Sequence, residues 1–194
     1  MTTASILVSE QPHPPSRGTV AMICLIIGEG AIFTMFIVAY VFFMGRSTSG
    51  PTPAILVPPW FNTICLLASS FTILFAERAI DRGQMRRFAA FWIVTILLAL
   101  KFLAGTATEW RDLIYDHGLT ISTNVFGTTF YSLVGLHATH VILGLIMLSV
   151  VLVFALTGHV NETHAERIKV LALYWHFVDW VWVAVFTTVY VIGR

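Results

Sequence analysis

The sequence predicts an all-α, polytopic membrane protein with five transmembrane helices. Its 194 residues are 57% hydrophobic and only 11% charged, and the mean hydropathy is +0.84. A globular domain carries roughly 25% charged residues, so this chain has too few charges to cover a water-facing surface. Its apolar residues gather in long runs, and about 20 such residues suffice to cross a bilayer as a helix.

Five runs meet this length requirement. They lie at about 19–44, 59–80, 88–109, 127–156 and 168–193. The strands of a membrane barrel have roughly 10 residues, and apolar and polar residues alternate along them. These runs are about twice as long and show no such alternation, so helices are expected. We therefore expect a tail at 1–18 and a membrane domain at 19–194.

The links between the runs support these divisions. They lie at 45–58, 81–87, 110–126 and 157–167. The first link contains Gly50 and Pro51, which favour a turn. The first apolar run is longer than the roughly 7–15-residue core of a signal peptide, so we expect it to remain as a membrane anchor.

Lys and Arg are distributed unevenly between the two ends of the expected bundle. One end holds seven of them: Arg17, Arg78, Arg82, Arg86, Arg87, Arg167 and Lys169. The other end holds Arg46, Arg111 and Arg194. Positive residues concentrate on the cytoplasmic side, so we expect a cytoplasmic N-terminus and a C-terminus outside.

Ionisable side chains inside the runs are candidate functional residues, because an unpartnered charge in a membrane costs several kcal/mol. They are Glu29, Lys101, His137, His140, His176 and Asp179, and Glu109 falls at a helix end. Glu29 begins a stripe with Phe33, Phe36 and Tyr40 on one helix face. We expect this stripe to face a neighbouring helix or a bound lipid.

The histidines allow two interpretations. His137 and His140 share a helix face, as metal ligands three residues apart would, but the same residues can hydrogen-bond between helices. At 1.5 Å per residue, His176 lies roughly 12 Å and His140 roughly 24 Å from the cytoplasmic end. The two axial ligands of one haem iron must lie at the same depth, so this pair is poorly placed to bind a haem. Glu29 and Asp179 both fall near 16 Å, so a shared polar layer is conceivable.

Several other chemistries find no support. The sequence has no Gly-rich phosphate loop, no CxxC, no HExxH and no serine elbow. A net charge of +1 argues against nucleic acid as a partner. Cys24 and Cys65 lie inside apolar runs and are expected to pack as small apolar residues. We expect no self-sufficient catalytic site and no metal site.

Two motifs resemble subunit III of haem–copper oxidases. Residues 174–182 read YWHFVDWVW, similar to the family's YWHFVDxVW, and residues 135–144 resemble its GFHGLHVIxG helix. Phe126–Phe130, Glu109-Trp110 and Gly28-Glu29 with Phe33 are similar to three further family motifs. The departures are Leu136, Ala138, Thr139 and Thr106. The resemblance covers most of residues 19–194. The chain looks like the five-helix short form of subunit III that many bacterial oxidases have.

The resemblance implies an accessory subunit of a bacterial terminal oxidase, a proton-translocating cytochrome c oxidase of aerobic respiration. Such a chain stabilises subunit I, binds phospholipid and supports proton uptake, while haem and copper belong to partner subunits. Subunit II, further subunits or a respiratory supercomplex are further implied partners. The implied location is the bacterial inner membrane.

The resemblance also implies roles for the ionisable residues. Glu29, Phe33, Phe36 and Tyr40 correspond to the lipid cleft or to proton uptake. The structural polar core comprises Glu109, His137, His140, His176 and Asp179. Lys101 matches no family position. Two alternatives stay open: subunit III of a quinol oxidase or nitric oxide reductase system, and a stand-alone proton-coupled transporter.

Overall fold

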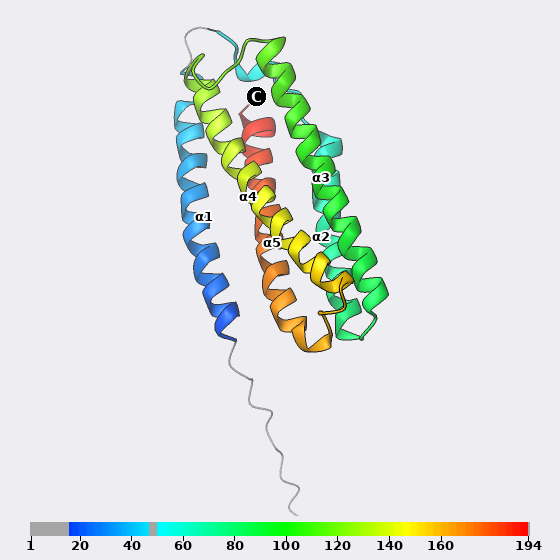
Figure 1. Cartoon of the computed structure of the whole chain (residues 1–194). Helices are drawn as coiled ribbons and strands as arrows, with labels where there is room; N and C mark the ends of the chain where they lie inside the picture. The colour runs from blue at the N-terminus through cyan, green and yellow to red at the C-terminus, as the bar shows by residue number, and fades with distance from the viewer. Residues whose placement is uncertain (1–15, 47–49, 194) are drawn as a thin grey trace, which may run out of the picture.

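The structure, a computed structural model, describes residues 16–46 and 50–193, apart from the side chain of Glu162, and consists of five long helices (Figure 1). These are α1 (Arg17–Phe43), α2 (Trp60–Asp81), α3 (Met85–Tyr115), α4 (Val125–Leu156) and α5 (Ala165–Phe186). The described residues contain no strand, and all five helices are long and apolar enough to cross a membrane. The predicted fold class is thereby confirmed. Most of the predicted tail lies outside the described residues.

Short elements complete the chain. α5 continues as a π-helical segment, Thr187–Ile192, and single 3-10 turns occur at Pro53–Ile55 and Glu162–His164. Ser16 caps α1 by accepting a hydrogen bond from the Thr19 amide, and Asn124 caps α4 by accepting one from the Gly127 amide. Gly83 adopts a φ of 67°, which allows the tight turn between α2 and α3.

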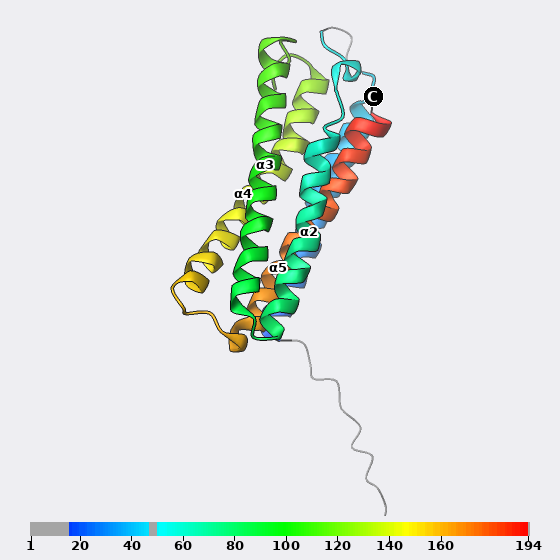
Figure 2. The same cartoon turned by 90° about the vertical axis from the view of Figure 1, so that its right-hand side faces the viewer.

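α4 and α5 form the centre of the bundle. α1 packs against both of them, α2 packs against α5, and α3 packs against α4 and against its antiparallel neighbour α2 (Figure 1). The second half of α4 diverges from α3 towards its end (Figure 2). Since the number of long helices is odd, α1 begins at one end of the bundle and the C-terminus lies at the other.

Buried tryptophans tie the helices together. Trp92 Nε1 on α3 donates to the carbonyl of Leu148 on α4 at 2.8 Å. Trp182 Nε1 on α5 donates to Thr63 Oγ1 on α2 at 3.2 Å. In a membrane the lipid tails are as apolar as leucine, so close packing and such hydrogen bonds hold helices together.

The helix ends differ from the predicted spans where charged residues lie. α3 continues six residues beyond the predicted end at 109, to Tyr115. This extension contains Arg111 and Asp112, which end an apolar run but do not end a helix. Glu109 therefore lies inside α3 and not at its end.

Candidate functional site

Glu29 on α1 pairs with His140 on α4. Glu29 Oε2 lies 3.1 Å from His140 Nε2, while His140 Nδ1 lies 2.8 Å from the carbonyl oxygen of Leu136. A carbonyl can only accept, so Nδ1 carries a hydrogen. A hydrogen bond between Glu29 Oε2 and His140 Nε2 needs one further hydrogen, which lies either on the carboxyl group or on His140 Nε2. The contact therefore joins α1 and α4 through a hydrogen bond between two ionisable side chains.

The stripe that begins at Glu29 divides between the bundle interior and its surface. Phe33 and Tyr40 are each 2% exposed, and the Phe33 ring centroid lies 4.9 Å from that of His140. Phe36 is exposed, and the Glu29 side chain is 29% exposed. Glu29 and Phe36 are therefore accessible at the surface of the bundle, while Phe33 and Tyr40 pack inside it.

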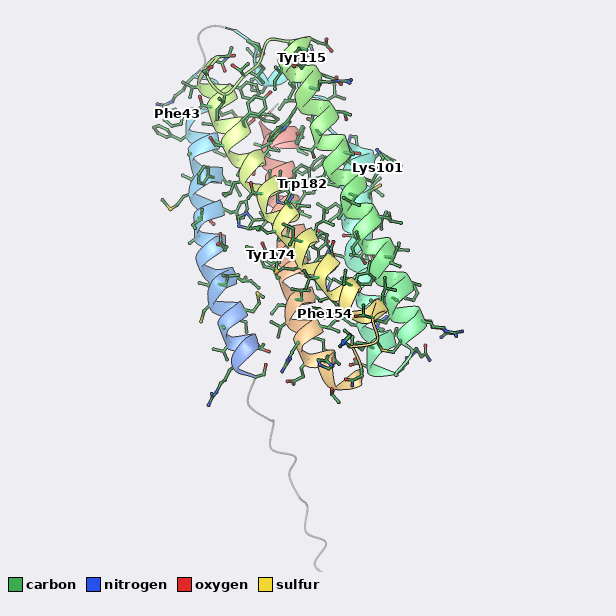
Figure 3. The ribbon with its side chains drawn as sticks, in the orientation of Figure 1. Phe43, Lys101, Tyr115, Phe154, Tyr174 and Trp182 are labelled. Carbon is green, nitrogen blue, oxygen red and sulfur yellow. The ribbon has the colours of Figure 1, made fainter. Side chains whose placement is uncertain are left out.

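His137 is fully buried among aromatic rings. It stacks on Trp182 with a centroid distance of 4.9 Å, and the Phe102 ring meets it edge-on at 5.8 Å. Trp182 lies in the middle of the bundle (Figure 3). Neither ring nitrogen of His137 has a hydrogen-bond partner in the part of the chain that the structure describes. A polar ring without partners in such an apolar interior costs free energy.

Asp179 on α5 sits against two serines of α2. Ser70 Oγ donates to Asp179 Oδ2, and Ser69 Oγ lies 3.4 Å from the same oxygen. Trp175 Nε1 donates to Ser69 Oγ at 2.9 Å, and the Ser69 hydroxyl donates to the Leu66 carbonyl at 2.6 Å. These contacts join α2 and α5 through a buried carboxyl group. Neither serine was among the predicted site residues, although two adjacent hydroxyls in an apolar run were a signal.

Glu109 on α3 accepts a hydrogen bond from Tyr190 in the π-helical segment. The distance from Tyr190 Oη to Glu109 Oε1 is 2.7 Å. The amide of Gly193 donates to the Thr188 carbonyl at 2.9 Å, an i→i−5 hydrogen bond that widens the last turns of the helix. The hydrogen bond between Tyr190 and Glu109 connects the C-terminal end of the chain with α3.

Glu29 and Asp179 lie in two separate hydrogen-bonded contacts and not in the shared polar layer that their similar depth made conceivable. Glu29 pairs with His140, and Asp179 hydrogen-bonds to α2. Counting residues from the ends of the predicted spans placed His140 about 8 Å deeper than Glu29, yet the two side chains are in contact. Straight-helix counting fails here because α4 is longer than its neighbours and diverges from the bundle.

Lys101 lies on the outer side of α3 and not inside the bundle (Figure 3). Its side chain is exposed, and its Nζ lies 5.4 Å from the centroid of the Phe61 ring near the start of α2. No carboxylate lies within ion-pair distance of it among residues 16–46 and 50–193. An exposed lysine can extend its ammonium group towards the nearer membrane surface.

No group of three or more His, Cys, Asp or Glu side chains in the described structure could hold a metal ion. His140 uses its two ring nitrogens for Glu29 and Leu136, and His176 Nδ1 contacts Ser70 Oγ at 3.2 Å. The geometry thus supports the interhelical hydrogen-bonding interpretation for His140 and His176.

Comparison with known proteins gives a consistent result. The model of the cytochrome c oxidase subunit III family matches residues 17–194. Cytochrome c oxidase subunit 3 of Alkalihalophilus pseudofirmus is 36% identical over 169 residues, which cover 86% of this chain and 82% of the relative. The protein of the same name from Thermostichus vulcanus is 31% identical over 196 residues, 99% of this chain and 95% of the relative.

A longer relative is matched over about half of its own length. Cytochrome c oxidase subunit 3 of Arabidopsis thaliana is 35% identical over 132 residues, which make up 68% of this chain but 48% of the relative. The bacterial relatives above match over most of both chains. With a family match that spans all five helices and their buried polar contacts, the chain belongs to the cytochrome c oxidase subunit III family.

Proposed function

We propose that this chain is the accessory subunit III of a bacterial haem–copper cytochrome c oxidase in the inner membrane. The observation that carries the proposal is the family match over residues 17–194. The chain itself has a supporting and non-catalytic role, and the haems and copper belong to partner subunits. The oxidoreductase reaction is that of the complex.

The surface of α1 supports a role in contacting lipid and neighbouring subunits. Phe33 and Tyr40 are the only buried residues of α1 in the described structure. Large apolar side chains such as Met35 and Val38 are 71% and 60% exposed. The rest of the α1 surface is thus available to phospholipid or to subunit I, which we propose as the main partner.

Glu29 is the best candidate for the support of proton uptake and lipid binding. Its carboxyl group is partly exposed on the surface of α1 and lies 3.1 Å from His140 Nε2. A lipid headgroup or a water molecule can reach the exposed part, while the His140 imidazole holds the other side of the carboxyl group. Phe36 provides an exposed aromatic surface two turns further along α1.

Removal of the chain from the purified oxidase tests this function. We expect the depleted complex to begin turnover normally and then to lose activity and thermal stability sooner than the intact complex. Adding back the purified chain is the control and should restore both properties. A depleted complex with unchanged stability and unchanged sustained turnover would contradict the proposal.

The identity of the electron donor follows from the partner subunits. The relatives named above are all cytochrome c oxidase subunits, which favours cytochrome c over a quinol. A copper-binding subunit II encoded beside this chain supports cytochrome c as the donor. A subunit II without copper ligands would point to a quinol oxidase.

A further inference from the structure

The outer face of the α2–α3 pair carries one charged side chain among exposed apolar ones (Figure 3). Phe61 and Ile64 of α2 and Val94 and Leu97 of α3 are between 41% and 65% exposed. Lys101 follows Val94 and Leu97 at i+7 and i+4, so the three side chains share one side of α3. Lys101 also lies beside Phe61, because its Nζ is 5.4 Å from the centroid of that ring. We call these five residues the α2–α3 face.

Lys101 lies at the depth of the hydrocarbon layer. The nearest exposed charged residues along α3 are Arg87 and Arg111, about 21 Å and 15 Å away at 1.5 Å per residue. The hydrocarbon core of a bilayer is about 30 Å thick, so Lys101 falls within it when the two arginines lie near its surfaces. The four methylene groups of a lysine stem span less than half of the shorter distance. The ammonium group therefore stays below the level of the lipid phosphates.

No carboxylate in the described part of the chain lies within ion-pair distance of this ammonium group. The Phe61 ring attracts a cation but does not replace an anion. The carboxyl groups inside the long helices have other partners, in the contacts Glu29–His140, Asp179–Ser70 and Glu109–Tyr190. Ionisable residues in membrane spans almost always face the bundle interior and pair there, whereas Lys101 faces outwards. Its counter-charge therefore has to come from a second molecule.

We infer that the α2–α3 face docks a transmembrane helix of a further membrane subunit, and that an Asp or Glu side chain of this helix pairs with Lys101. Charge complementarity selects this occupant. A carboxylate carried by a helix can lie at any depth of the bilayer, whereas the phosphate of a lipid lies at the membrane surface. The apolar neighbours Phe61, Ile64, Val94 and Leu97 suit the apolar side chains of such a helix.

The shape and the position of the face agree with a protein partner. Ala104 and Thr108 follow Lys101 at i+3 and i+7 and are exposed, so small side chains continue the same side of α3. Small residues let membrane helices approach closely, and close packing together with polar contacts holds such helices together. The α2–α3 pair lies across the bundle from α1 (Figures 1 and 2). A partner on this face therefore leaves α1 free for subunit I.

Site-specific photo-cross-linking in the native membrane tests whether a protein helix covers this face. A photoreactive phenylalanine analogue at Leu97, which is 58% exposed, should capture a transmembrane segment of one other subunit that carries Asp or Glu near the cross-link. The matched control is the same analogue at Val38 on α1, which is 60% exposed and should not capture that segment. Cross-links to lipid alone, to a second copy of this chain, or to the same segment from both positions would overturn the inference.

A charge exchange at Lys101 tests the ion pair in the complex purified through the tagged chain. Lys101→Glu should lower the recovery of the captured subunit, relative to the tagged chain, by roughly tenfold or more, because like charges then face each other. Lys101→Met should lower it less, and Lys101→Arg is the control that retains the charge and the subunit. Replacing the Asp or Glu of the captured helix by Lys should restore recovery with Lys101→Glu. Unchanged recovery with Lys101→Glu, or no restoration by the exchange, would contradict the ion pair.

The assignment of this partner to the oxidase rests on the proposed function, and the two can fail separately. Recovery of subunit I with Lys101→Glu shows that the variant folds and assembles. If every other subunit is then also recovered as in the wild type, the contact at the α2–α3 face is refuted and the proposed function stands. If the wild-type chain recovers the captured subunit but no haem-bearing subunit I, the contact stands and the proposed function fails.

Discussion

At the scale of single residues, the close approach of α4 and α5 depends on Gly144. A Cβ at this position would lie 2.7 Å from Cζ3 of the Trp175 ring. Since the ring is buried and its Nε1 is fixed by Ser69, neither helix can give way cheaply. The absence of a side chain at Gly144 allows the two central helices to pack.

Gly144→Ala should therefore destabilise the chain. Overpacking costs about 1–3 kcal/mol, and an overlap as close as 2.7 Å with a buried ring outweighs the gain of about 1 kcal/mol in helix propensity. Gly28→Ala is the matched control, because a Cβ there meets nothing within 4 Å. Thermal unfolding in detergent should give a lower midpoint for Gly144→Ala than for Gly28→Ala, and the reverse order would refute this packing argument.

Within the described residues, Tyr190 donates a hydrogen bond to Glu109. Tyr190→Phe keeps the ring and removes the hydroxyl, so the Glu109 carboxyl group loses its partner. We expect a loss of about 1–3 kcal/mol in stability. Tyr115→Phe, at an 81% exposed position, should change it little. Denaturation in detergent measures both variants, and equal stability would show that the Glu109 contact contributes nothing.

Some of these residues could be identified from the sequence, and others could not. Glu29, His140 and Asp179 stood out because ionisable residues are costly in a membrane. Their partners did not, because Ser69, Ser70 and the Leu136 carbonyl carry no charge and gain their role only when helices pack. The isolated position of His137, with no hydrogen-bond partner in the described structure, likewise follows from its aromatic neighbours.

At the scale of the helices, α5 is joined to α2 by its tryptophans. Trp175 is buried and donates to Ser69, whereas Trp180 on the same helix is 72% exposed. Trp175→Phe should lower stability by about 1–3 kcal/mol through the lost hydrogen bond. Trp180→Phe removes an equal number of atoms and should have little effect. Similar unfolding midpoints for the two variants would contradict the proposed tie between α2 and α5.

The existence of the helices was easier to predict than their ends. Five long apolar runs are sufficient evidence for five spans, since an unpaired backbone is not tolerated in hydrocarbon. The additional turns of α3, up to Tyr115, contain charged residues and reach beyond the apolar run. The π-helical end of α5 had no local signal, and it contains Tyr190, which donates a hydrogen bond to Glu109.

For the whole molecule, the distribution of positive residues gives a testable orientation. The structure places Arg17, Arg78 and Arg167 at one end of the bundle and Arg111 at the other. We expect the former end to face the cytoplasm. Alkaline phosphatase fused to the C-terminus should be active, because it folds only outside the cytoplasm. An inactive C-terminal fusion together with an active N-terminal fusion would reverse the orientation.

The central claim is that this chain works as subunit III of a haem–copper cytochrome c oxidase. The most direct measurement is purification of the tagged chain from its native membrane in mild detergent, followed by visible spectroscopy and identification of the bound proteins. We expect stoichiometric recovery of haem-bearing subunit I and copper-bearing subunit II with oxidase activity. A stable chain recovered alone, without haem absorption or oxidase subunits, would contradict the claim.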